Sequence, residues 1–133
     1  QIIFGAFVSG LDAGKIYQNW PLMGNTFFPD DTKVSSFNSL FNFSNQSLVQ
    51  FYHRNLAYLI TFYILIILFF ILKRKIRILY KPSLFLIVFL TLQILLGIFT
   101  LVSGLNIYLA SAHQISSVLL VFSIVNLYYF HIK

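Results

Sequence analysis

Three histidines are the side chains in this sequence that could bind a transition metal. His53 and His113 lie within apolar runs, whereas His131 stands beside the carboxyl end. The chain has no cysteine, which excludes thiolate metal sites, disulfides and cysteine nucleophiles. No pair of carboxylates, phosphate-binding loop or nucleophile elbow accompanies the histidines. Any chemistry of the chain itself is therefore expected to depend on His53 and His113.

The two histidines lie at matching depths in their apolar runs. Each is roughly five or six residues inside the outer end of its run, so at 1.5 Å per residue both lie about 8–9 Å below one surface. Two imidazoles at equal depth on neighbouring helices can bind one iron from opposite sides, as axial ligands of a haem. The alternative is that each imidazole only makes hydrogen bonds within the bundle, and the matched depth favours ligation. His131 is interpreted as an interfacial residue.

The composition indicates that the helices carrying these histidines lie in a membrane. Of the 133 residues, 59% are hydrophobic and 9% are charged, and the mean hydropathy is +0.84. A soluble domain carries about 25% charged residues. The net charge of +6 does not indicate a nucleic-acid partner, because five of the nine cations lie between Lys73 and Lys81 in a membrane-flanking pattern. The sequence therefore predicts an all-α integral membrane protein in contact with lipid.

Polar and apolar runs divide the chain into predicted spans and loops. A span needs about 20 apolar residues, and from Pro82 to Ile132 there is no Asp, Glu, Lys or Arg. This stretch suits two passes, separated by a turn at Ser103–Asn106. We expect no internal repeat within these residues. The predicted segments are the end of a truncated transmembrane helix (1–11), an outer loop (12–48), a transmembrane helix (49–72), an inner basic loop (73–81), a second transmembrane helix (82–102), an outer turn (103–106), a third transmembrane helix (107–130) and an inner tail (131–133).

Charge predicts the orientation of these segments. The basic loop Lys73–Lys81 contains five cations and no anion, whereas the loop 12–48 contains both signs. The positive-inside rule places the basic loop on the cytoplasmic or matrix side. The loop 12–48 and the turn 103–106 are then expected on the outer side, where part of the loop would cover the histidine site.

A face of small and weakly polar residues could leave room for a flat ligand. Gln93, Gly97, Thr100 and Gly104 are spaced 4, 3 and 4 residues apart, as on one side of a helix. The face favours a porphyrin and close helix packing equally. Arg54 follows His53 and could meet haem propionates, or it could be a snorkelling interfacial arginine.

Several motifs, in this order, resemble the haem A synthase family. They cover nearly the whole chain and are Gly5-Ala-Phe-Val-Ser-Gly-Leu-Asp-Ala-Gly14, Tyr17-Gln-Asn-Trp-Pro-Leu-Met23, Val49-Gln-Phe-Tyr-His-Arg54, Leu92-Gln-Ile-Leu-Leu-Gly97 and Ala112-His-Gln114. The resemblance implies the carboxyl-terminal half of a pseudo-symmetric eight-helix protein. This half is a four-helix bundle, and its first helix is truncated in this chain.

The resemblance also implies a function, a cofactor and a set of site residues. The family oxidises a methyl group of haem O to the formyl group of haem A for cytochrome oxidase. The implied cofactor of this half is haem b, with its iron on His53 and His113, and with Arg54, Gln93, Gly97 and Gln114 around it. In the other half of the family's fold a glutamate stands three residues before the first histidine. Here Gln50 occupies that place, which argues against a complete active site.

The resemblance implies a partner and a location as well. The partner is the amino-terminal half of the same enzyme, and the membrane is a bacterial cytoplasmic membrane or the mitochondrial inner membrane. The electron donor, the source of the formyl oxygen and the oligomeric state stay open. Two other classes of function also stay open, namely a haem-binding membrane anchor of a respiratory complex that only transfers electrons, and a packing subunit without a cofactor.

Overall fold

The chain folds as an all-α protein, as predicted, in a computed structural model that describes residues 1–32 and 36–132. Lys33 and Ser35 of the predicted outer loop and Lys133 of the predicted inner tail lie outside the described residues. The described helices are α1 (Ile2–Gly10), α2 (Gln46–Lys73), α3 (Tyr80–Val102) and α4 (Ile107–His131), with short 3-10 helices at Ala13–Lys15, Phe37–Phe41 and Arg77–Leu79.

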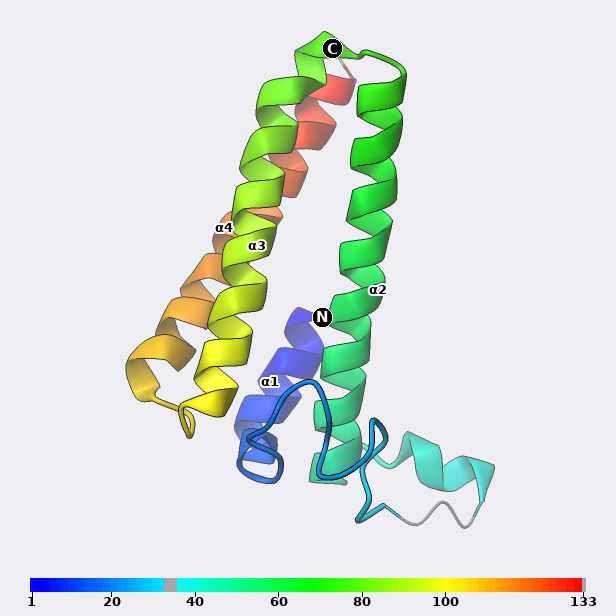
Figure 1. Ribbon diagram of the computed structural model, residues 1–133, viewed down its shortest axis with the longest axis vertical. Helices are drawn as coiled ribbons and strands as arrows, with labels where there is room; N and C mark the ends of the chain where they lie inside the picture. The colour runs from blue at the N-terminus through cyan, green and yellow to red at the C-terminus, as the bar shows by residue number, and fades with distance from the viewer. Residues whose placement is uncertain (33–35, 133) are drawn as a thin grey trace.

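The chain runs up and down, so that its loops gather at two ends (Figure 1). One end carries the long connection from α1 to α2 and the turn between α3 and α4; we call it the loop end. The other carries the connection between α2 and α3 and the end of α4; we call it the basic end. α2, the segment Arg77–Val102 and α4 are each long and apolar enough to cross a membrane.

Local sequence explains where the long helices begin. Asn45 and Asn106 are the N-caps of α2 and α4, and their side chains accept hydrogen bonds from backbone N–H groups of the first turn. α3 begins at Tyr80, before the predicted start at Pro82. A proline is tolerated there because the first-turn N–H groups have no partner within the helix.

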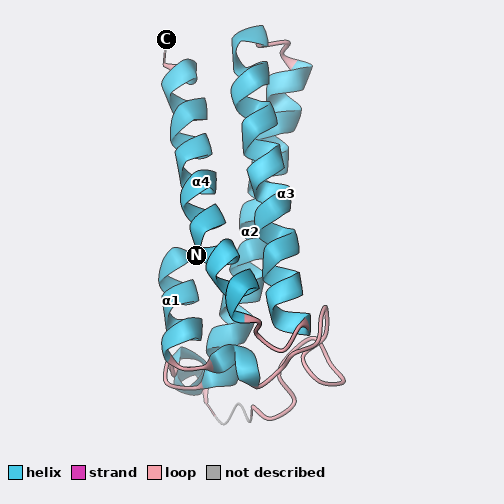
Figure 2. Cartoon of the chain, turned by 90° about the vertical axis from the view of Figure 1, so that its left-hand side faces the viewer, coloured by secondary structure: helices cyan, strands magenta, loops and turns pink. Residues whose placement is uncertain are grey.

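The helices form two antiparallel pairs of unequal length. α3 packs along α4, and the short α1 packs against the part of α2 nearest the loop end (Figures 1 and 2). The buried apolar core fills the other half of the bundle, toward the basic end, and consists of Ile64, Leu68, Ile71, Leu79, Leu86, Leu90 and Leu127. The loop end therefore has α1 where the basic end has only the three long helices.

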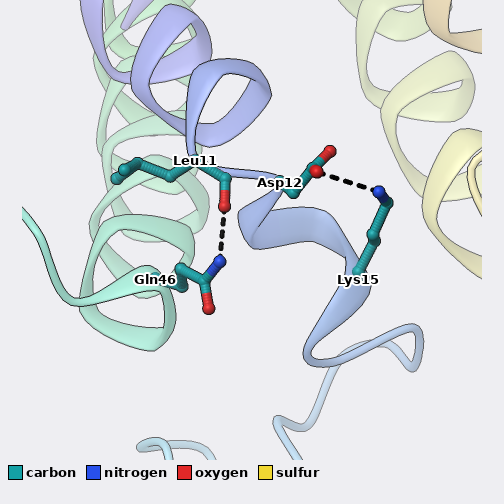
Figure 3. Close-up of polar contacts among 4 residues, drawn as sticks. All are labelled: Leu11, Asp12, Lys15 and Gln46. Carbon is teal, nitrogen blue, oxygen red and sulfur yellow. Dashed lines mark hydrogen bonds and ion pairs between the residues drawn. The ribbon is translucent and has the colours of Figure 1, made fainter.

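Polar contacts fasten the end of α1 to the start of α2. The Gln46 side-chain amide donates to the Leu11 carbonyl at 2.5 Å (Figure 3). Beyond Leu11, Asp12 takes a left-handed conformation with φ 55° and pairs with Lys15 at 2.9 Å. Gly14 then packs against Leu105 in the turn between α3 and α4, where a β-carbon at residue 14 would come within 2.9 Å of that side chain. The loop end thus connects the two helix pairs.

Candidate functional site

His53 lies in the second turn of α2 and faces α1. A β-carbon added at Gly5 would lie 3.3 Å from its Cε1 atom, so the glycine lets the ring approach the helix. The Gln1 side-chain amide nitrogen donates to the His53 backbone carbonyl at 3.1 Å and also faces ring Nε2 at 3.5 Å. An amide nitrogen only donates, so Nε2 acts as the acceptor and the ring proton belongs on Nδ1.

His113 lies at the corresponding place on α4 and faces α3. A β-carbon added at Gly97 would come within 2.9 Å of its Cε1 atom, a tighter fit than at His53. The Gln93 amide nitrogen faces His113 Nε2 at 3.3 Å, and the Ser116 hydroxyl donates to the oxygen of the same amide. Ser116 therefore fixes which way the amide points, and again Nε2 accepts.

The two histidine environments form a repeat that was missed in the sequence. Gln-Ile-x-x-Gly occurs at 1–5 and at 93–97, and Val-Ser-Gly-Leu follows at 8–11 and at 102–105. An asparagine N-cap then opens each histidine helix, at Asn45 and Asn106. The expectation of no repeat is therefore wrong. The glycine and the following valine are three positions apart in the first copy (Gly5 and Val8) and five apart in the second (Gly97 and Val102). A search for a repeat with constant spacing therefore misses the match.

Each of the two imidazoles has one buried ring nitrogen without a described partner. Nδ1 of His53 and Nδ1 of His113 are both buried and have no hydrogen-bond partner among the described residues. An unsatisfied buried donor costs about 1–3 kcal/mol. Within the described ranges there is no group of three or more His, Cys, Asp or Glu residues that could hold a metal ion.

Arg54 and Gln50 bind the loop between α1 and α2. The Arg54 guanidinium donates to the carbonyls of Tyr17 at 3.0 Å and Leu22 at 3.1 Å. The buried Gln50 amide donates to the same Tyr17 carbonyl at 2.8 Å, and its own oxygen is buried without a described partner. Arg54 was predicted to meet haem propionates or to snorkel at the interface. In this structure its guanidinium holds the loop in place.

Within this loop, the Asp30 carboxylate accepts hydrogen bonds from two other loop residues. The Tyr17 hydroxyl donates to Asp30 at 2.9 Å, and the Asn25 backbone N–H donates to the other oxygen of Asp30 at 3.1 Å. The Asn25 backbone hydrogen bond, assisted by Tyr17, keeps the pKa of Asp30 below its ordinary value. Burial raises the pKa of Tyr17 to about 12, so the phenol keeps its proton at neutral pH. Gly24, at φ 78°, leaves the space that the Asp30 carboxylate fills.

No described hydrogen bond joins the remaining predicted residues to either imidazole. Gln114 is exposed on α4, and His131 is exposed at the basic end. Thr100 lies on α3, where its hydroxyl donates to the Leu96 carbonyl at 2.7 Å. Gly104, predicted to continue the face of Gln93 and Gly97, lies beyond α3 with φ 72°. α3 stops at Val102, so the face ends one turn earlier than predicted.

Gln1, Ser116 and Tyr17 take part in the site but were not predicted to do so. Gln1 is the first residue of the sequence, and Ser116 is one of several serines in an apolar helix. The signal that could have found Gln1 is its repeat with Gln93. Ser116 could have been found from its spacing of three residues after His113, which places both on one side of α4. No such signal pointed to Tyr17, because its contacts depend on the path of the loop.

Comparisons with known proteins agree over almost the whole chain. A model of the family described as Cytochrome oxidase assembly protein matches residues 1–125. A protein named Heme A synthase from Pelagibacter ubique is 45% identical over 123 residues, which cover 92% of this chain and 36% of that protein. Proteins of the same name from Rickettsia felis and Wolbachia pipientis are each 40% identical, over 133 and 120 residues that cover 100% and 90% of this chain. The matched regions are 39% and 33% of those two relatives. The chain thus spans less than two fifths of the length of these relatives, and no solved structure matches it.

Proposed function

Because this chain belongs to the family of cytochrome oxidase assembly proteins, we propose that it is the haem-b-binding, carboxyl-terminal half of a haem A synthase. The relatives named Heme A synthase support this proposal. The whole enzyme would be a membrane oxidoreductase that oxidises a methyl group of haem O to the formyl group of haem A. Haem O is then the substrate of the whole enzyme, and haem b is the cofactor of this half.

The observation that carries the proposal is the matched pair of histidines. Each lies near the start of its helix at the loop end, rests against a glycine of the paired helix, and has an Nε2 atom that now accepts from a glutamine amide. A nitrogen with an available lone pair is what haem iron takes from histidine as an axial ligand. Both Nδ1 atoms are buried without a described partner. The residues present therefore fit a group that is held by two imidazoles.

The residues of the chain have separate roles in this proposal. His53 and His113 would hold the iron, and the bound haem b would supply one-electron transfer. Gln93, held by Ser116, orients the His113 ring. Gly97 sets how closely that ring approaches α3. Gln114 is a further proposed contact from the exposed side of α4.

The loop between α1 and α2 would exclude water from the histidines. Arg54 and Gln50 fix its first part through the Tyr17 carbonyl. The Trp20 indole N–H donates to the Tyr58 hydroxyl at 3.0 Å, which ties the loop to α2 one turn beyond Arg54. We place this loop on the outer side of a bacterial cytoplasmic or mitochondrial inner membrane. An amino-terminal half of the same enzyme is the proposed partner.

One observation favours a second function, that of a haem-binding anchor that only transfers electrons. In this half Gln50 is an amide that holds the loop, and an amide does not exchange a proton as an acid would. A chain with two histidines and no acid beside them could carry an electron without chemistry of its own. The two functions differ in their product, since only the first leads to haem A.

The test is the optical spectrum of the purified chain reconstituted with haem b. We expect a spectrum typical of iron with two imidazole ligands. His53→Ala and His113→Ala should each abolish that spectrum and lower the haem retained after gel filtration. His131→Ala is the matched control, because His131 is exposed at the basic end, and it should behave as the unaltered chain. Equal haem retention by all three variants would exclude His53 and His113 as the ligands.

A further inference from the structure

A recess lies between α3 and α4, on the basic-end side of the contacts that Gln93 and Ser116 make at His113. It has a volume of about 290 Å³ and is lined by Phe85, Phe89, Leu119, Phe122, Ser123 and Asn126. We call it the α3–α4 groove. Its volume is just below the range of about 300–1,000 Å³ for small-molecule pockets, and three of its six lining residues are phenylalanines. It lies in the half of the bundle toward the basic end.

Asn126 is the polar feature of this groove that lacks a partner. Its side chain is half-buried and has no hydrogen-bond partner among the described residues. The neighbouring Ser123 hydroxyl, in contrast, donates to the Leu120 carbonyl at 2.7 Å. A polar side chain within a membrane span is costly and marks a candidate functional site. The Asn126 amide is thus a donor and an acceptor at the side of an apolar groove.

The spacing along α3 places a cation above the groove. Lys81, Phe85 and Phe89 are four residues apart and lie on one side of the helix. At 1.5 Å per residue, Phe85 and Asn126 both lie about 7 Å inside the basic end of their helices. Phe89 and Phe122 lie about 6 Å deeper. From the surface inward, the groove therefore presents an ammonium group, a carboxamide and then aromatic rings.

The cations of the basic end are available to an anion, and Lys81 is the one that α3 itself carries. Lys73, Arg74, Lys75, Arg77 and Lys81 are all exposed, and the one salt bridge between described residues is Lys15–Asp12 at the other end. Clusters of Lys and Arg immediately beside a membrane span attract anionic lipid headgroups. The order of groups in the groove matches such a lipid, which has a phosphate, then ester carbonyls, then acyl chains.

We propose that the α3–α4 groove binds one anionic diacyl phospholipid from the bilayer. Lys81 pairs with the phosphate, the Asn126 amide donates to an ester carbonyl, and an acyl chain lies along Phe85, Phe89 and Phe122. A free phosphate ion would use the cations but not the aromatic groove, so the occupant is a lipid. The site is independent of the histidines and of the haem proposal.

The test uses the full chain in phosphatidylcholine vesicles with trace spin-labelled phosphatidylglycerol or spin-labelled phosphatidylcholine. Electron paramagnetic resonance measures the fraction of each label that is immobilised at the protein. We expect a preference for phosphatidylglycerol. Lys81→Gln should lower it about fivefold, as expected for the loss of one cation at a membrane surface. Asn126→Leu and Phe89→Ala should lower it as well. Lys73→Gln is the matched control, because Lys73 lies at the end of α2 over the Phe69 ring.

Three outcomes would overturn the proposal. One is equal immobilisation of the two labels by the unaltered chain. Another is an equal loss of preference in Lys73→Gln and Lys81→Gln, which would show diffuse attraction to the basic segment without a site. The third is a cross-link between two chains through Phe89→Cys at native lipid levels, which would assign the groove to a second copy. Circular dichroism of each variant shows whether its helices are retained.

Discussion

A glycine opposite each histidine sets how closely the imidazole approaches its partner helix. A methyl group at residue 97 would lie 2.9 Å from His113 Cε1, whereas one at residue 5 would lie 3.3 Å from His53 Cε1. The obstructing atoms belong to an aromatic ring, which cannot bend away as the end of a flexible side chain can. Close packing transmits such a displacement to neighbouring groups.

We therefore expect Gly97→Ala to displace the His113 ring and to reduce haem b retention strongly. Gly5→Ala should have a smaller effect. Gly10→Ala is the control, since a β-carbon there meets nothing within 4 Å. Alanine favours a helix by up to about 1 kcal/mol over glycine, so Gly10→Ala should be neutral or stabilising. Haem content and the thermal midpoint of each variant provide the comparison. If Gly97→Ala retained haem as Gly10→Ala does, the close fit at His113 would have no role in binding.

The sequence predicted which residues lie near the histidines better than it predicted which atoms those residues contact. The four-residue spacing of Gln93 and Gly97 predicts that they share a side of α3, and in the structure both lie against His113. That the amide reaches Nε2 depends on how α3 and α4 are rotated about their axes, which packing along the whole pair decides. Arg54 illustrates the limit, because its carbonyl partners at Tyr17 and Leu22 come from a loop whose path no helical spacing predicts.

At the scale of elements, the asparagine N-caps set where the histidine helices begin. The Asn45 side chain accepts from the Leu48 N–H at 3.1 Å. Asn45→Ala should lower the free energy of unfolding by about 1 kcal/mol, because the first turn of α2 loses that acceptor. Unfolding in a mixed-detergent titration measures the change. Asn25→Ala removes a loop asparagine whose side chain has no described hydrogen bond and should change stability much less. Equal losses in both variants would contradict the capping role.

The hydrogen bonds of the Asp30 carboxylate make the loop between α1 and α2 sensitive to acid. Its carboxylate accepts from the Asn25 N–H and the Tyr17 hydroxyl, and its pKa in the folded chain is lowered. A lowered pKa contributes stability above the ordinary aspartate value of about 3.9, and this stability is lost as the pH falls through the folded value. The protection of the Asn25 amide from hydrogen exchange, taken relative to the intrinsic exchange rate at each pH, should therefore hold above about pH 4 and fall below it.

Asp30→Asn should lower the protection of the Asn25 amide at every pH and remove the loss of protection in acid. Asp12→Asn, which breaks only the exposed pair with Lys15, should leave the Asn25 amide unchanged, because exposed ion pairs contribute little. If the acid dependence persisted in Asp30→Asn, another group would control the loop. The sequence predicted that part of this loop would cover the site. The contacts of Asp30 could not be predicted, because they depend on the left-handed turn at Gly24.

At the scale of the molecule, the two ends of the bundle are built differently. The apolar core lies toward the basic end, whereas the histidines and the glutamines that face them lie toward the loop end. Hydropathy alone predicted the three spans, because an apolar run of about 20 residues has the length that a helix needs to cross the hydrocarbon core of a bilayer. It could not predict the pairing of α1 with α2 and of α3 with α4, which the repeat of Gln, Gly and His in each pair now explains.

The proposed role of the chain as one half of a haem A synthase predicts that it makes no haem A by itself. The chain spans less than two fifths of the relatives named Heme A synthase, and its buried Gln50 amide holds the Tyr17 carbonyl where the other half is expected to carry an acid. Acid–base assistance from a positioned group contributes about 10²–10⁴-fold to a rate. We therefore expect cells that make this chain alone to contain no haem A, and cells that also make the amino-terminal half to contain it. Haem extraction and chromatography measure both. His113→Ala in the two-part enzyme should lower haem A through loss of haem b, whereas His131→Ala should not. Haem A produced by this chain alone would show that the histidine pair and its surroundings form a complete active site, in which case Gln50 would not mark the division between the halves.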